Sequence, residues 1–142
     1  MNHDTYDDAY ISGILNEVRT IAVVGASVNE ERASFRVMKF LIEKGYTVFP
    51  VNPGQAGKEI LGRMTYAQLA DVPGPIDMVD VFRASQSVPP VVEDALALDP
   101  LPKVIWMQLG VRHDDAAAKA EAAGVKVVMN RCPAIEYPRL IG

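Results

Sequence analysis

Short apolar runs alternate along this chain with amphipathic segments that have the spacing of helices. Five of the runs predict strands, at residues 20–24, 47–51, 76–82, 103–107 and 125–129. Helices are predicted between them, over 34–44, 87–98 and 113–124, with a shorter one near 66–70 and an amphipathic segment before the first strand, over 7–18. Because the strands are mostly apolar and helices separate them, they favour a parallel sheet covered on both faces.

This alternation predicts a single α/β domain over residues 1–142, with a Rossmann-type, doubly wound, five-stranded parallel sheet. The simplest strand order, counted along the chain, is 3-2-1-4-5. An N-terminal helical segment over 1–19 precedes the sheet. The last segment, 131–142, contains two prolines and is expected to form an ordered tail. In this order, ligands are expected beyond the carboxyl ends of the strands, at the switch point between strands 1 and 4.

Composition narrows the function classes. The chain has 142 residues, a formal net charge of −4 and a pI near 5.1, which argues against nucleic-acid binding. One cysteine and two histidines argue against a zinc site, so no metal is expected. The first ten residues are polar and acidic, and no apolar run approaches the ~20 residues of a membrane span. We therefore expect a cytoplasmic protein with no membrane partner.

The segment from Thr20 to Val37, TIAVVGASVNEERASFRV, carries the main candidate chemistry. An apolar strand ends in Gly25, and a helical pattern begins about ten residues later. A strand, a glycine turn and a helix start form a phosphate cradle, because the first N–H groups of the helix point at the anion. The dinucleotide fingerprint would place glycine at Ser27 and Glu30, so the loop predicts a nucleotide-like ligand without identifying it.

The end of the second strand argues against NAD. NAD-binding domains usually carry an acidic residue there, about 20 residues past the first glycine, to hold the ribose hydroxyls. Here the residues are Val51, Asn52 and Pro53, and the first carboxylate, Glu59, follows the basic Lys58. A basic residue suits a phosphate on the ribose, which both NADP and coenzyme A carry.

Several segments together resemble a known family. They are IAVVGAS with the loop to SFRVMKFL, GYTVFPVNPG, EILG, PIDMVDVFR, VIWMQLG and AAGVKVVMNRCP. In order and spacing they resemble the small stand-alone CoA-binding proteins, which are related to the N-terminal CoA-binding domain of the succinyl-CoA synthetase alpha subunit. The family often has aspartate where Asn130 stands, so this chain departs from the pattern there.

The resemblance implies a Rossmann-type fold that binds coenzyme A or an acyl-CoA. Carried over position by position, it implies a phosphate loop, an adenosine end, residues flanking the ligand after strand 3, and residues towards the pantetheine arm. The phosphate loop would be Gly25, Ala26, Ser27, Arg32 and Ser34, and the adenosine end would be lined by Val51, Asn52 and Pro53. The residues flanking the ligand would be Phe82 and Arg83, and those towards the pantetheine arm would be Trp106, Met107 and Gln108. The candidates for neutralising the phosphates are Arg32, Lys58 and Arg83, because cations and backbone N–H groups hold such anions.

Catalysis is not expected. The related ligases need a phosphorylated histidine on a second domain and a nucleotide-grasp domain, which this chain lacks. His113 is expected to be solvated or to cap a helix, and Arg36 and Lys39 to lie on a solvated helix face. Cys132 is interpreted as a partly buried loop cysteine, with a mixed disulfide to CoA as the alternative.

The sequence therefore predicts a non-catalytic CoA-binding or acyl-CoA-binding protein. Two alternatives remain open: an NADP-binding, oxidoreductase-like subunit, and a regulatory subunit whose pocket is vestigial. The sequence names no protein partner.

Overall fold

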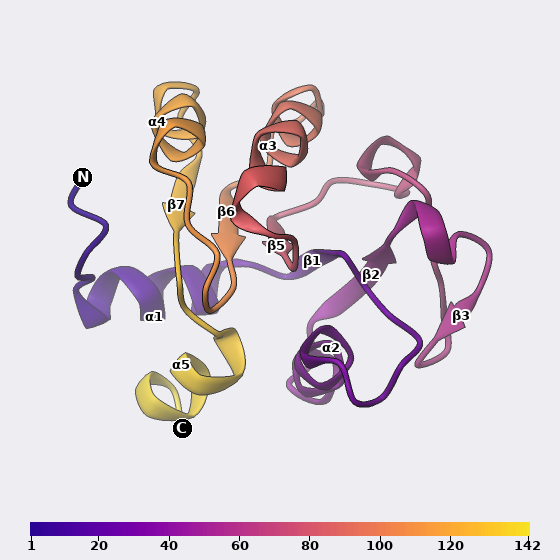
Figure 1. Cartoon of the computed structure of the whole chain (residues 1–142). Coiled ribbons are helices and arrows are strands. Elements are labelled where there is room, and N and C mark those ends of the chain that lie inside the picture. Colours follow the sequence, from indigo (N-terminus) through magenta and orange to yellow (C-terminus); the bar gives the residue numbers. More distant parts are fainter.

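The computed structural model describes all residues, 1–142. Its main sheet has five parallel strands, β1 (Thr20–Val24), β2 (Thr47–Val51), β5 (Met78–Val81), β6 (Val104–Met107) and β7 (Lys126–Val128). Their order across the sheet is β2-β1-β5-β6-β7. Helices cover both faces, so the predicted α/β, Rossmann-type architecture is confirmed (Figure 1).

The position of the third strand requires a correction. Counted along the chain, the main-sheet order is 2-1-3-4-5 rather than 3-2-1-4-5, because β5 lies between β1 and β6. The expected order would have put β2 inside the sheet. Pro50 of β2 lacks an N–H group, which suits an edge strand and disfavours a central one. The switch point therefore lies between the first and third strands, β1 and β5.

The helices form two layers (Figure 1). Helices α1 (Asp8–Glu17), α2 (Ala33–Glu43) and α5 (Pro133–Leu140) cover one face, and α3 (Val88–Leu96) and α4 (Asp114–Ala122) cover the other. Each layer packs on its own cluster of buried apolar side chains. None of these helices has the length and apolar character that crossing a membrane requires.

The connection from β2 to β5 differs from the expectation of a short helix near 66–70. It contains the 3-10 turns η1 (Pro53–Gln55) and η2 (Leu69–Asp71), and between them a hairpin of β3 (Glu59–Ile60) and β4 (Arg63–Met64). Each hairpin strand has only two residues, which is too short for an alternating pattern to indicate a strand.

The C-terminal segment, expected as an ordered tail, forms helix α5. Pro133 occupies the first turn of α5, where the backbone N–H would have no partner within the helix. Pro138 lies inside α5, and the helix continues past it to Leu140. Tertiary packing decides this outcome, since Tyr137 and Leu140 contact the core that α1 and α2 also cover.

Candidate functional site

A cleft opens at the carboxyl ends of the strands. The chain leaves β1 through α2 on one face and leaves β5 through α3 on the other, so the two loops diverge there. The cleft has a volume of about 500 Å³, within the usual range of small-molecule sites. Its lining comes from the ends of four strands and the start of α2: Gly25, Ser27, Arg32, Ala33, Ser34, Asn52, Gln55, Phe82, Arg83, Ala84, Gln108, Leu109 and Val111.

Gly25 is required where the chain turns out of β1. Its φ is +92°, in the region that favours glycine. A Cβ atom at this position would lie 2.2 Å from the backbone oxygen of Phe82. The Gly25 N–H donates to the Val51 oxygen at 2.9 Å, and the Phe82 N–H donates to the Val24 oxygen at 2.8 Å, so the turn is tied to both neighbouring strands. The predicted glycine turn is thus explained by a close approach of two strand ends.

The start of α2 faces the cleft with unused donors. Arg32 is the N-cap residue, and the N–H groups of Ala33 and Ser34 have no backbone acceptor. Asn29 N–H donates to the Ser27 hydroxyl oxygen at 3.0 Å, which folds the loop before the helix. Free N–H groups and the positive end of the helix dipole make this helix start suitable for an anion.

The charges in the cleft are of one sign. Its lining contains Arg32 and Arg83 and no carboxylate, and neither arginine forms an ion pair. Arg83 donates to the Asn52 side-chain oxygen at 3.4 Å, and the Asn52 amide donates to the Ala26 oxygen at 2.9 Å. The three strand-end loops are therefore cross-linked, and the uncompensated positive charge favours an anionic ligand.

An unpartnered amide lies in the same cleft. Gln108 follows β6 and is only 5% exposed, and its Oε1 atom has no hydrogen-bond partner. Phe82, Ala84, Leu109 and Val111 supply apolar surface around it, and Leu109 is 55% exposed at the rim. The cleft thus combines a cationic end with an apolar region and a buried amide.

The structure brings together eight of the residues that the sequence singled out, and leaves six outside the cleft lining. Val51 and Pro53 line a neighbouring cavity of about 330 Å³, which shares Arg83 with the cleft. Ala26 is buried, and Lys58 lies on an exposed turn before β3. Trp106 and Met107 are fully buried, because alternate residues of a central strand point into the two cores. The expectation that Trp106 and Met107 lie along a ligand is therefore not met.

Five lining residues were not among those that the resemblance implied: Ala33, Gln55, Ala84, Leu109 and Val111. Each lies within three residues of a position that was selected. The usable signal was the strand end itself, since residues that follow a parallel strand lie at the ligand edge whatever their type.

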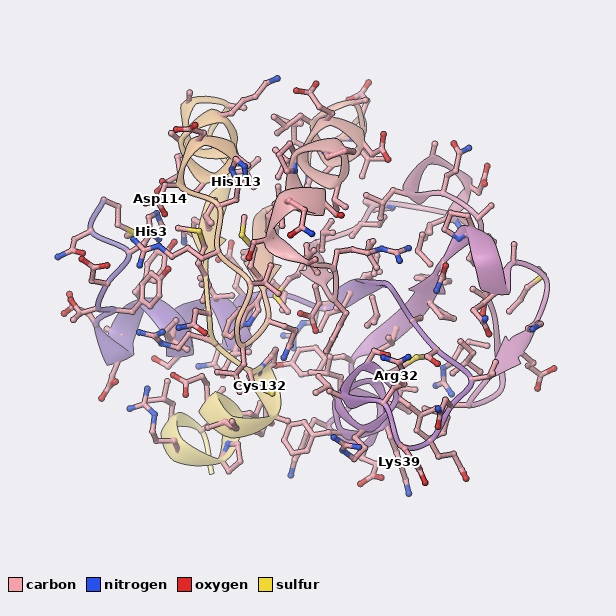
Figure 2. All side chains as sticks on the ribbon, in the orientation of Figure 1. His3, Arg32, Lys39, His113, Asp114 and Cys132 are labelled. Atoms are coloured by element: carbon pink, nitrogen blue, oxygen red, sulfur yellow. The ribbon has the colours of Figure 1, made fainter.

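Other candidate residues have structural roles. His113 Nδ1 accepts from the Ala116 N–H at 3.0 Å, so the expected helix cap is confirmed. Arg36 and Lys39 are exposed, and Figure 2 shows Lys39 pointing away from α2. Cys132, at the start of α5, is 7% exposed and lies outside the cleft lining, well away from Arg32 in Figure 2.

Asn130, where the chain departs from the family pattern, occupies a special backbone position. Its φ is +58°, a region that asparagine and aspartate tolerate better than most residues. Its side-chain oxygen accepts from the Gly110 N–H at 2.7 Å. Aspartate offers the same acceptor, so the departure preserves the contact that shapes the loop after β6.

Comparison with known proteins identifies the family. The model of the CoA binding domain family matches residues 19–138. The chain belongs to this family. The match spans every strand and the whole cleft, so the geometry above is that of a CoA-binding domain fold.

Relatives of this family member include proteins of similar size and much larger enzymes. It is 38% identical over 124 residues to the uncharacterized protein YneT of Bacillus subtilis, covering 87% of this chain and 89% of that protein. A hypothetical protein from Pyrococcus horikoshii has a solved structure with a TM-score of 0.91 and 39% identity, covering 100% of this chain and 97% of that one. The alpha subunit of an ADP-forming acetate–CoA ligase from Pyrococcus furiosus is 34% identical over 80 residues, which are 54% of this chain and 17% of that subunit.

Proposed function

We propose that this protein binds coenzyme A or an acyl-CoA without catalysing a reaction on it. The observation that carries the proposal is the start of α2, where two free N–H groups and Arg32 face a cleft without carboxylates. CoA carries a diphosphate and a 3′-phosphate, and arginine with backbone N–H groups is the usual way to hold them. The family's description names the same ligand.

In this proposal the diphosphate lies at the start of α2, between Arg32 and Arg83. Charge-assisted hydrogen bonds from these groups stabilise the complex. The apolar side chains beyond Phe82 accommodate the less polar part of the ligand. No observation favours NADP over CoA, since the matched family and the ligase relative are both described by CoA.

The experiment is calorimetric titration of ligand-stripped protein with CoA, with NADP as the control ligand. We expect saturable binding of CoA and none of NADP. Arg32→Ala should weaken CoA binding about tenfold, equivalent to about 1.4 kcal/mol, while stability changes by less than about 0.5 kcal/mol. Lys39→Ala is the matched control, because Lys39 is a cation further along α2, is exposed and does not line the cleft.

Dephospho-CoA sharpens the test. If Arg32 holds the diphosphate, the tenfold loss in Arg32→Ala persists with this ligand, because only the 3′-phosphate has been removed. Unchanged CoA affinity in Arg32→Ala would remove the start of α2 from the site. Binding of NADP without CoA would overturn the proposed function.

A further inference from the structure

One carboxyl group of the sheet, two residues before Phe82 of the cleft, has no hydrogen-bond partner. Asp80, in β5, is fully buried, and neither of its side-chain oxygens has a hydrogen-bond partner. Its register partners are Val23 on β1 and Trp106 on β6. All three lie on the face covered by α1, α2 and α5, since Val23 and Trp106 belong to that core and Val79 and Val81 to the other. The Trp106 N–H is already used, because it donates to the Arg131 oxygen.

Nothing on this face compensates a negative charge at Asp80. Glu136 of α5 is paired with Arg139, and the hydroxyls of Tyr10 and Tyr46 donate to backbone oxygens. The buried side chains of α2 include no titratable group, and Cys132 of α5 is a weak donor at most. Burial raises the pKa of Asp80 well above its ordinary value. The neutral acid has one O–H group, which needs an acceptor.

Gln108 supplies that acceptor by its position. The Gln108 N–H donates to the Val81 oxygen at 3.2 Å, which continues the β5–β6 pairing by one step. Gln108 therefore stands opposite Phe82 and two residues beyond Trp106, on the same face as Asp80 and diagonal to it. Its Oε1 is buried without a donor, whereas its Nε2 is not among the buried, unpartnered atoms. A long side chain reaches a diagonal neighbour on a sheet.

We propose that Asp80 is a positioning residue whose neutral carboxyl donates a hydrogen bond to Gln108 Oε1, so that the Gln108 NH₂ group is presented to an acceptor oxygen of the bound CoA. The proposal rests on the proposed function and adds a determinant of ligand recognition inside the sheet. One proton joins two buried groups that are each unsatisfied alone. The same hydrogen bond determines which end of the amide faces the ligand.

The test is a double-substitution cycle at Asp80 and Gln108, read by calorimetry with CoA. We expect Asp80→Leu and Gln108→Leu each to weaken CoA binding about tenfold, and the double variant to bind no more weakly than either one. Asp80→Asn keeps a neutral donor of similar size, so it should bind within about twofold of the wild type. Val79→Ala is the matched control. Val79 precedes Asp80 in β5 and its side chain faces the other core, so the substitution should lower stability and leave CoA affinity unchanged.

Several outcomes would overturn the positioning role. They are affinity losses that simply add in the double variant, an Asp80→Asn variant as weak as Asp80→Leu, and an Asp80→Leu variant that binds normally. Asp80→Leu is expected to fold, because it replaces an unsatisfied buried polar group with an apolar one.

The failure of the proposed function would be seen separately. If wild-type protein binds no CoA, the same variants are unfolded with urea in the absence of ligand. Non-additive shifts of the unfolding midpoint at Asp80 and Gln108 would still support their hydrogen bond, and additive shifts would overturn it.

A second ligand identifies the acceptor oxygen. Gln108→Leu is titrated with CoA and with adenosine 3′-phosphate 5′-diphosphate, which keeps the phosphates of CoA and lacks the pantetheine arm. A loss seen only with CoA assigns the acceptor to an oxygen of that arm, and a loss with both assigns it to the phosphorylated nucleotide part. No loss with either ligand would overturn the proposal.

Discussion

The two faces of the sheet are built differently, although each carries a large buried core. The cluster under α3 and α4 joins 21 buried apolar residues, and neither the strand residues of that face nor α3 and α4 add a buried polar side chain. The face under α1, α2 and α5 also buries 18 apolar residues in one cluster, and it adds the buried polar side chains of Ser34, Asp80 and Gln108, of which Ser34 and Gln108 line the cleft. An apolar core tolerates such groups only at a cost in stability. The comparison teaches that one face serves stability, whereas the other combines stability with the proposed ligand site.

The largest effect is expected from Ile105→Ala on the apolar face. Ile105 is fully buried in β6, and its truncation leaves a cavity that costs about 2–5 kcal/mol of unfolding free energy. The CoA affinity of the folded protein should stay within about twofold of wild type. Urea denaturation and calorimetry measure the two quantities. A clear loss of affinity in folded Ile105→Ala protein would break the separation between the two faces.

Gly25→Ala should come next and should affect both properties. The left-handed backbone conformation costs an alanine about 1–2 kcal/mol, and its Cβ would press on the Phe82 oxygen. We expect a total loss of roughly 2–3 kcal/mol, together with weaker CoA binding, because the strand ends that frame the cleft must separate. Gly45→Ala is the matched control, since Gly45 has a similar φ of +94° and open space around it. Equal effects at the two glycines would contradict the role of the close approach.

Asp80→Asn tests the polar side of the comparison through pH. The native pKa of Asp80 is raised, so the unfolded chain loses this proton near pH 4 while the native protein keeps it. The contribution of the Asp80 carboxyl to the free energy of unfolding is fully present below that pH. It decreases by about 1.4 kcal/mol per pH unit as the pH rises towards the native pKa. The stability of Asp80→Asn relative to wild type should therefore increase between pH 5 and pH 7. A constant difference, measured by urea denaturation at each pH, would show that Asp80 is ionised in the native state.

The smallest effect is expected from His113→Ala. The imidazole caps α4 on the apolar face, and losing a cap typically costs about 1 kcal/mol. Thermal unfolding should show this loss, with CoA affinity unchanged because His113 does not line the cleft. His113→Asn should recover most of the stability, since asparagine is also a good cap. If CoA binding weakened instead, the loop after β6 would depend on the α4 cap.

Much of the architecture could be predicted from local patterns. The apolar runs located all five strands of the main sheet, and Gly25 followed by a helical pattern located the start of α2. These features depend on neighbouring residues alone. The β3–β4 hairpin and α5 could not be predicted in the same way. Two-residue strands have no period, and Pro138 inside α5 argues against a helix that packing nevertheless stabilises.

The candidate site was predictable to the extent that it follows strand ends. Arg32, Asn52, Phe82, Arg83 and Gln108 line the cleft as a set because parallel strands bring their carboxyl ends to one edge. Trp106 and Met107 belong to the same motif in the sequence, but both point into the cores. Direction alternates along a strand, so proximity in sequence to a strand end does not decide whether a side chain reaches the cleft.

The sequence by itself determined the strands of the main sheet, the glycine turn and the resemblance to a CoA-binding family, because each depends on short-range order along the chain. Only the tertiary structure decided the place of β5 in the sheet, the absence of carboxylates from the cleft and the diagonal placement of Asp80 and Gln108. These features depend on which strands pair and in which register. Strand pairing and register are determined by packing and burial among residues that are far apart in the chain.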